Sequence, residues 1–243
     1  MTAREAHQAQ WRALKDKPLI DKLKYIFTYY WPGILGGVFV IVFLVSWLTT
    51  ALSQKDAVLS GYLLNGFTKS NYSGDFKQEF LDYQQIDSDK YLFKLTADVA
   101  YSSTEVSDTA GVVLESIVVQ TYAQELDFIV VDLENYPVLS AYYMDLFSVM
   151  SEEQIAKWKD CFVYVEKAEL EQLTSDSMGE FALPKYHISS DGLSQPIPLG
   201  IRIPENSKLF DAYTYVSKDV IFGISRSAQN IENTLAFLEY IMN

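Results

Sequence analysis

The sequence predicts an α/β protein in which one N-terminal transmembrane helix precedes a domain built on a mostly parallel β-sheet. Three observations predict it. Residues 31–52 carry no charge, and the chain after them alternates strand-like and helix-like segments. The charge also changes sign, because residues 1–31 have a net charge of +3 and the residues after 52 a net charge of −16. A domain with this much negative charge repels the phosphates of nucleic acid and the headgroups of anionic lipids. The charge therefore argues against nucleic acid as a partner.

The uncharged stretch WPGILGGVFVIVFLVSWLTTAL predicts the transmembrane helix. At about 1.5 Å per residue its 22 residues extend roughly 33 Å, enough to cross the hydrocarbon core of a bilayer. Trp31 and Trp47 lie near its ends, where aromatic rings favour the interface. A cleaved signal peptide is the alternative, although its apolar region is normally only about 7–15 residues long.

The flanking charges predict the orientation and divide the chain into three parts. Basic residues precede the span at Lys15, Lys17, Lys22 and Lys24, and only two follow it closely. By the positive-inside rule, residues 1–30 are cytoplasmic, residues 31–52 cross the cell membrane once, and residues 53–243 form an extracytoplasmic domain.

Two features predict further contacts in or at the membrane. Apolar residues recur at helical spacing in residues 16–31, which indicates an interfacial helix that ends where the chain turns at Trp31-Pro32. Two roles are left open for this helix: a plain membrane anchor and a docking site for a partner protein. Gly33 and Gly37 form a GxxxG pair, a spacing that allows close approach of two transmembrane helices, although glycine is common in such helices.

The first half of the outer domain predicts a β-α-β-α-β-α order, and therefore a mostly parallel sheet covered on both faces. Period-two alternation indicates a strand at residues 91–99, and the apolar run DFIVVD indicates a buried central strand. The expected elements are strands at 59–65, 91–99 and 127–132 and helices at 75–84, 109–124 and 134–144.

The second half is less regular. Ser151 can cap a short helix, CFVYV indicates a strand at 161–165, and residues 172–196 indicate loops around a weak strand at 181–188. Two strands, 197–203 and 218–224, are expected to return to the main sheet. An apolar stripe predicts a C-terminal helix at 231–242.

The sequence has few residues suited to catalysis or metal binding, so we predict no catalytic residue, no metal site and no cofactor. One cysteine and two histidines exclude a zinc site of the Cys/His type, and no glycine-rich phosphate loop or GxSxG elbow occurs. An extracytoplasmic enzyme with His187 as its base is the remaining catalytic alternative. Cys161 lies in an apolar run and is expected to be a buried, inert thiol.

The carboxyl ends of the three best strands are the predicted ligand site, because ligands of open α/β sheets gather where the strand order reverses. Asp132 and Glu134 follow the buried strand and are candidates to hold a cation or a small polar ligand, and Tyr136 is a candidate to stack on it. The other strand ends contribute Asn65, Tyr101 and Ser102. The alternative is structural, since an Asp at a strand end often caps the next helix.

Two segments resemble extracytoplasmic solute-binding proteins of ABC importers. One is VQTYAQELDFIVVDLENYPVLSAYYMDL at residues 119–146, which lacks the glycine that precedes Asp127 in the usual Gly-x-x-Asp phrase. The other is the closing helix NIENTLAFLEYIM, together with the strand before it. The N-terminal anchor is similar to that of a group of membrane-anchored proteins of Gram-positive-type bacteria.

The resemblance implies a noncatalytic, reduced periplasmic-binding-protein-like domain with a second lobe limited to about residues 148–195. It implies an accessory of an ABC-type transporter, with membrane transporter subunits and the lipid bilayer as partners. Solute-binding proteins normally have two full lobes and a lipid anchor, so the alternative is an interaction or scaffold subunit of a membrane complex that binds no small molecule.

Overall fold

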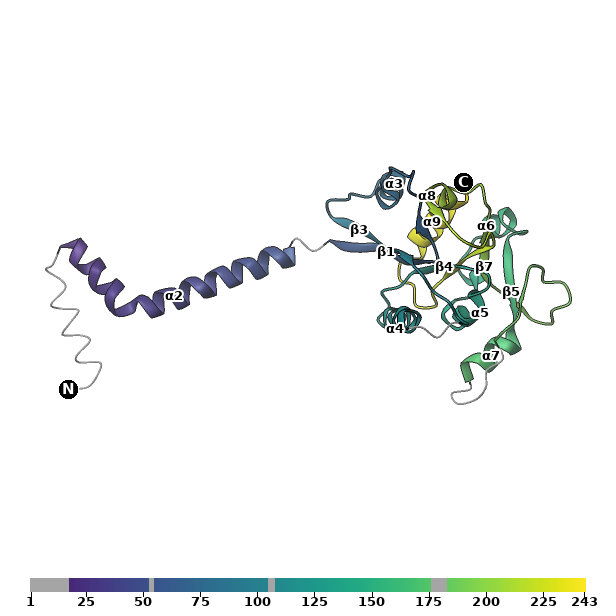
Figure 1. The fold of residues 1–243 in the computed structure, drawn as a ribbon, viewed down its shortest axis with the longest axis horizontal. Helices are drawn as coiled ribbons and strands as arrows, with labels where there is room; N and C mark the ends of the chain where they lie inside the picture. The colour runs from purple at the N-terminus through teal and green to yellow at the C-terminus, as the bar shows by residue number, and fades with distance from the viewer. Residues whose placement is uncertain (1–17, 53–54, 105–107, 176–182) are drawn as a thin grey trace. The chain divides into compact units, whose positions relative to one another are not determined.

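The computed structural model describes residues 18–52, 55–104, 108–175 and 183–243 (Figure 1). Its internal contacts divide the chain into two units, Met1–Gln54 and Lys55–Asn243. The described part of the first unit is one long helix, and the second unit is an α/β domain. The α/β class predicted from the sequence is therefore confirmed.

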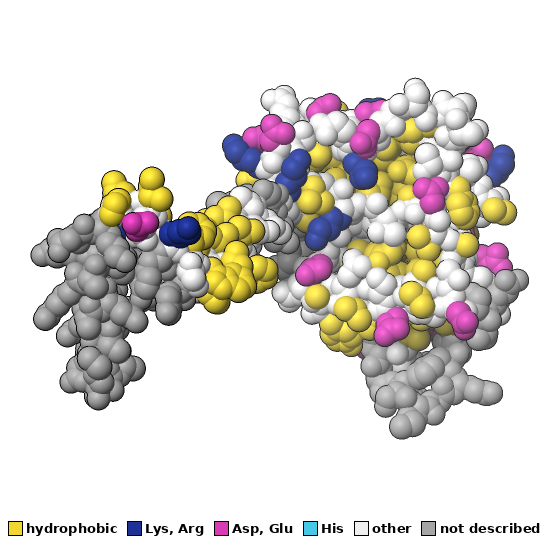
Figure 2. All heavy atoms as spheres, turned by 60° about the vertical axis from the view of Figure 1, so that its left-hand side comes forward, with side chains coloured by type: hydrophobic (Ala, Val, Ile, Leu, Met, Phe, Trp, Pro, Cys, Tyr) yellow, Lys and Arg dark blue, Asp and Glu magenta, His cyan; other side chains and the backbone are white. Residues whose placement is uncertain are grey.

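The long helix α2 (Leu19–Leu52) is apolar enough over Trp31–Thr50 to span a membrane. Large apolar side chains of this stretch, such as Phe39 and Trp47, are exposed. Figure 2 shows hydrophobic side chains gathered on this part of the molecule. The hydroxyls of Thr49 and Thr50 donate to helix carbonyls one turn back, so they need no partner from outside.

The prediction of a separate helix that ends at Trp31-Pro32 is wrong. The helix continues through Pro32, and Figure 1 shows α2 bent in its first half. Proline removes one intrahelical hydrogen bond and crowds the preceding turn, which bends a helix without ending it when the flanking residues keep their helical bonds.

A seven-stranded sheet in the order β3-β1-β4-β9-β7-β5-β6 forms the centre of the domain. Its strands are β1 (Asp56–Leu64), β3 (Tyr91–Val99), β4 (Phe128–Asp132), β5 (Phe162–Glu166), β6 (Tyr186–His187), β7 (Pro196–Ile203) and β9 (Val220–Ile224). Two short strands, β2 (Phe67–Thr68) and β8 (Tyr213–Thr214), pair separately.

The sheet is mixed, with a parallel part and an antiparallel part. Strands β3, β1 and β4 run parallel, as predicted. From β9 onward every neighbouring pair is antiparallel, so the parallel prediction holds for the first three strands only. Because β9 is reversed, β7 points the same way as β4 and their carboxyl ends reach the same edge.

Helices cover both faces of the sheet (Figure 1). One face packs against helices that include α3, α8 and α9, and the other against helices that include α4 and α5. The helices of the domain are α3 (Phe76–Tyr83), α4 (Asp108–Tyr122), α5 (Tyr136–Leu139), α6 (Glu152–Lys157), α7 (Lys167–Ser175), α8 (Lys208–Ala212) and α9 (Ile231–Met242), with 3₁₀ turns at Ser140–Tyr142 and Leu146–Ser148.

Stacked phenylalanines fill the core on the α9 face. The Phe128 ring stacks on Phe222 at 5.2 Å and on Phe237 at 4.8 Å between ring centroids. Gly61 of the neighbouring strand makes room for it, since a Cβ there would lie 2.2 Å from the Phe128 ring. Such aromatic burial is the main source of stability for this layer.

The buried carboxylate of Asp127 ties the amino end of β4 to the last helix. It accepts hydrogen bonds from the backbone N–H groups of Ser60, Gln229 and Asn230 at 2.9–3.1 Å. Two of these donors precede α9, so Asp127 satisfies N–H groups that the helix itself leaves open. In the sequence this residue closes the segment resembling the Gly-x-x-Asp phrase, and here its role is structural.

The described residues between 148 and 195 join the same sheet as the rest of the domain. This segment, expected to form a reduced second lobe, contributes β5 and β6 at one end of the sheet, and Ser151 begins α6 with a capping box. Part of the expected weak strand at 181–188 lies outside the described residues. Its described part holds β6, and α7 occupies the start of the stretch expected to be loop.

Candidate functional site

The carboxyl edge of the sheet is where the sequence places the candidate site. Strand β1 lies between β3 and β4, so the chain turns to one side after β1 and to the other after β3. This reversal is the topological switch point at which open α/β sheets bind ligands. The segments that follow β1, β3 and β4 meet there.

Asn65, Tyr101 and Asp132 come together at this switch point through hydrogen bonds among themselves. The Asn65 side chain accepts from the Tyr101 backbone N–H at 2.7 Å and donates to the Tyr101 carbonyl at 2.8 Å. The same Nδ2 donates to Asp132 Oδ2 at 2.6 Å. Asn65 adopts a left-handed backbone with φ 59°, a conformation that asparagine tolerates better than most residues.

Asn135 completes this group, which we call the switch-point network (Asn65, Tyr101, Asp132 and Asn135). The Asn135 backbone N–H and side-chain amide donate to Asp132 at 2.9–3.1 Å, and its Oδ1 accepts from the Ser103 N–H at 2.7 Å. Asp132 is 6% exposed and Asn135 is 7% exposed. The Asp132 carboxylate is therefore occupied by protein donors, as in the structural alternative for a strand-end aspartate.

Glu134 and Ser102 lie beside the network without joining its centre. Glu134 is exposed, and the Ser102 hydroxyl lies 3.2 Å from the Thr104 hydroxyl. Among the described residues no group of three or more His, Cys, Asp or Glu side chains could hold a metal ion. Asp132 and Glu134, which the sequence predicts as candidates to hold a cation, therefore have no third ligand of these types among the described residues.

Tyr136, expected to stack on a ligand, is fully buried. Its ring stacks on Tyr143 at 5.1 Å between centroids with 13° between the planes. Gly200 and Gly223 let the two rings lie against the strands, because a Cβ at either glycine would come within about 3 Å of a tyrosine ring or hydroxyl. Burial raises the pKa of Tyr136 and of Tyr143 well above the usual range of a phenol.

The hydroxyls of Tyr136, Tyr143 and Tyr215 are buried without a hydrogen-bond partner among the described residues. Burial is the main cause of the raised pKa of Tyr143 and of Tyr215, and the nearby Asp132 adds to it. The interior beside the network is therefore polar yet closed to solvent at these atoms.

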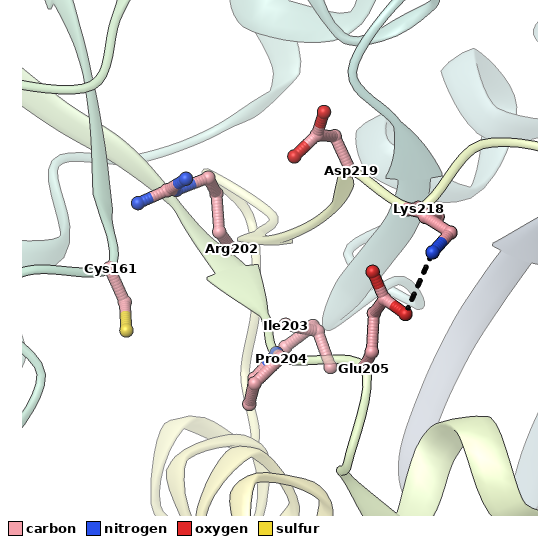
Figure 3. Close-up of a pocket in the computed structure, with 7 residues that line it drawn as sticks. All are labelled: Cys161, Arg202, Ile203, Pro204, Glu205, Lys218 and Asp219. Carbon is pink, nitrogen blue, oxygen red and sulfur yellow. Dashed lines mark hydrogen bonds and ion pairs between the residues drawn. The ribbon is translucent and has the colours of Figure 1, made fainter.

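A pocket of about 250 Å³ opens farther along the same edge (Figure 3). Its walls come from the carboxyl end of β7 and the amino ends of β9 and β5. We call it the β7–β9 pocket, and its lining residues are Cys161, Arg202, Ile203, Pro204, Glu205, Lys218 and Asp219.

Four charged side chains line the β7–β9 pocket, and they are unequally compensated. Lys218 and Glu205 form an ion pair at 3.2 Å in which both side chains are largely exposed. Arg202 donates through Nη2 to the Asp160 carbonyl at 3.0 Å, but its buried Nε has no partner among the described residues. Within the same described part of the chain, no ion pair or hydrogen bond involves the Asp219 carboxylate.

Burial raises the pKa of the Cys161 thiol in this pocket, while the nearby Arg202 opposes the rise. Cys161 is only partly buried, so the expectation of a buried thiol holds in part. A thiol with a raised pKa is a weak nucleophile at neutral pH, which fits the expected inert character.

Sequence reasoning missed the β7–β9 pocket because it fixed no direction for the two returning strands. The charged residues stand at the carboxyl end of one strand, in RIPE, and at the amino end of the other, in SKD. These ends meet only if the strands run antiparallel. The charged residues at both strand ends are visible in the sequence, but the relative direction of the two strands is not.

The remaining candidates are spread over the molecule. Gly33 and Gly37 lie on α2 with open space around their Cα atoms, and His187 lies in β6, partly buried. Within the described chain no structural feature links His187 to a nucleophile. No protein-family model, curated protein or solved structure matches this chain.

Proposed function

We propose that this chain is a noncatalytic, membrane-anchored binding protein whose outer domain takes a small polar ligand at the carboxyl edge of its sheet. The observation that carries the proposal is the β7–β9 pocket, in which Arg202 and Asp219 are not neutralised by the described protein groups. Charged groups at a cleft without protein partners are costly unless solvent or a ligand pairs with them.

The anchoring half of the proposal rests on α2 and its flanks. The helix is long and apolar enough to cross a bilayer, and basic residues precede it, which favours a cytoplasmic N-terminus and an extracytoplasmic domain. An anchored binding domain fits an accessory role beside an ABC-type transporter, as the resemblance to solute-binding proteins implies. The parallel order β3-β1-β4 with its switch point supports this likeness.

Native mass spectrometry tests the binding half. The full chain, reconstituted in lipid nanodiscs after mild purification, is expected to carry or take up a small polar molecule. Arg202→Gln should release it, because the guanidinium is the pocket's partly buried cation. Lys159→Gln, which removes a cation outside the β7–β9 pocket, is the matched control and should keep it. A folded wild-type sample that binds no small polar molecule would contradict the proposal.

An interaction or scaffold subunit is the second candidate, and the outer side of α4 favours it. Val112, Val119 and Tyr122 are 66%, 58% and 73% exposed on this helix. Apolar side chains aligned on one exposed helix face are common at protein interfaces. Crosslinking in native membranes from photoreactive groups at Val112 and Val119 tests it, with a group at the exposed Glu115 for comparison. A chain that crosslinks to no protein from any of these sites argues against the scaffold role.

A further inference from the structure

Arg202 and Asp219 occupy one side of the sheet edge without pairing. Arg202 lies opposite Ile221 in the β7–β9 ladder, and Asp219 is two residues before Ile221. Asp219 directly precedes β9, and side chains two residues apart along an extended chain point to the same face, so the two charges are diagonal neighbours. Such neighbours are about 7–8 Å apart between backbones, and here no ion pair joins them.

Figure 3 shows the Arg202 guanidinium directed toward the side of Cys161 and the Asp219 carboxylate apart from it, so a gap separates the two charged groups. Arg202 is held by its bond to the Asp160 carbonyl, and its own backbone N–H is fixed on the Cys161 carbonyl at 2.8 Å. The guanidinium cannot swing freely toward Asp219 without losing that bond. Lys218 is paired with Glu205, so its positive charge does not fully neutralise the Asp219 carboxylate.

We infer that the β7–β9 pocket binds a free α-amino acid as its zwitterion, a refinement that rests on the proposed binding function. The ligand carboxylate pairs with the outer nitrogens of the Arg202 guanidinium, because Nε is buried. The ligand ammonium pairs with the Asp219 carboxylate. In an α-amino acid a single carbon separates these groups, so one small molecule supplies both charges to the gap.

The size and the other walls of the pocket limit the ligand. A volume of about 250 Å³ accommodates one amino acid. Ile203, Pro204 and Cys161 supply the apolar or weakly polar wall, which suits a small aliphatic side chain such as that of alanine or valine. A peptide would also place its ammonium and carboxylate too far apart to meet both Arg202 and Asp219.

Calorimetry on the full chain in nanodiscs tests the inference with four probes: L-alanine, L-valine, N-acetyl-L-alanine and L-alaninamide. The free amino acids are expected to bind. The N-acetyl compound lacks the cation and the amide lacks the anion, so each should bind at least about 10-fold more weakly than L-alanine, the loss expected for one charge-assisted hydrogen bond. This comparison uses the unaltered protein and does not depend on how variants fold.

Substitutions assign the charges. Asp219→Asn should weaken L-alanine binding at least about 10-fold, with little effect on the affinity for N-acetyl-L-alanine, which has no ammonium to lose. Asp191→Asn removes the same charge from an exposed turn and should leave the affinity unchanged. Equal binding of L-alanine and its N-acetyl form, or an unchanged affinity in Asp219→Asn, overturns the inference.

The outcomes also separate this inference from the function on which it rests. If the amino acids fail to bind but another small anion, such as acetate or phosphate, binds in a manner sensitive to Arg202→Gln, the pocket is a ligand site and the zwitterion assignment is wrong. If no small molecule binds in a manner that depends on Arg202, both the assignment and the proposed function are wrong.

Discussion

Two polar groups share the carboxyl edge of the sheet, and they differ in how far the protein satisfies them. In the switch-point network, Asp132 accepts hydrogen bonds from Asn65 and Asn135 and is almost entirely buried. In the β7–β9 pocket, neither the Arg202 guanidinium nor the Asp219 carboxylate is in an ion pair with a described protein group. The comparison separates polar residues that hold the fold together from polar residues that are available to a ligand.

The largest expected effect belongs to the switch-point network. Asp132→Ala should lower the free energy of unfolding of the domain by about 3 kcal/mol, because the Asn65 and Asn135 amides lose their buried acceptor. Hydrogen exchange of the core amides of β1 and β4, measured on the full chain in nanodiscs, reports this loss.

Glu134→Ala is the matched control two residues away. Its side chain is exposed, so the free energy of unfolding should change by no more than about 0.5 kcal/mol. If Asp132→Ala were as mild as this control while a ligand lost its affinity, the comparison would be reversed and Asp132 would be the binding residue.

Local patterning predicted the elements well where one periodicity dominates. The strand expected at residues 91–99 and the helix expected at 231–242 have these bounds in the structure, because alternation and an apolar stripe each fix which face is buried. The switch-point meeting of Asn65, Tyr101 and Asp132 also followed from the parallel β-α-β order. These predictions needed only local pattern and the geometry of parallel strands.

Strand direction and burial depend on tertiary contacts that a single sequence does not contain. The reversal of β9 carries Lys218 and Asp219 to the carboxyl edge, which no local pattern indicates. The sequence places Tyr136 one turn into a helix as a candidate to stack on a ligand, yet Gly200 and Gly223 allow its ring and that of Tyr143 to lie on the sheet. Small residues on distant strands decided its burial.

Cys161, the chain's one cysteine, lines the β7–β9 pocket and gives a chemical readout of it. Its raised pKa leaves less thiolate at pH 8 than a free thiol has, so alkylation by iodoacetamide should be several-fold slower. Arg202 lowers this pKa, and Arg202→Gln should therefore shift the pH profile of alkylation to higher pH. The midpoint of the profile separates this electrostatic effect from a change in access.

Ligand protection is the second readout at Cys161. A ligand seated between Arg202 and Asp219 should slow alkylation further, since the thiol lines the same pocket. The same ligand should leave alkylation unchanged in Asp219→Asn at concentrations that protect the wild type. Protection that persists undiminished in Asp219→Asn would place the ligand elsewhere.

The smallest effect is expected from the ion pair at the pocket mouth. Lys218 and Glu205 are 79% and 60% exposed, and exposed pairs of this kind contribute at most about 1 kcal/mol and lose strength with salt. Glu205→Gln should change the free energy of unfolding by less than about 0.5 kcal/mol. Denaturant unfolding at low and high salt measures this change.

Glu205→Gln should also affect ligand binding, because Glu205 is the other carboxylate that lines the pocket. Without Glu205, Lys218 is free to approach Asp219 and to compete for the ligand ammonium's place, so the affinity for L-alanine should fall by a factor of about 2–5, the range of a weak surface pair. High salt should erase most of that difference. A loss as large as that of Asp219→Asn would mean that Glu205, and not Asp219, holds the ligand's cation.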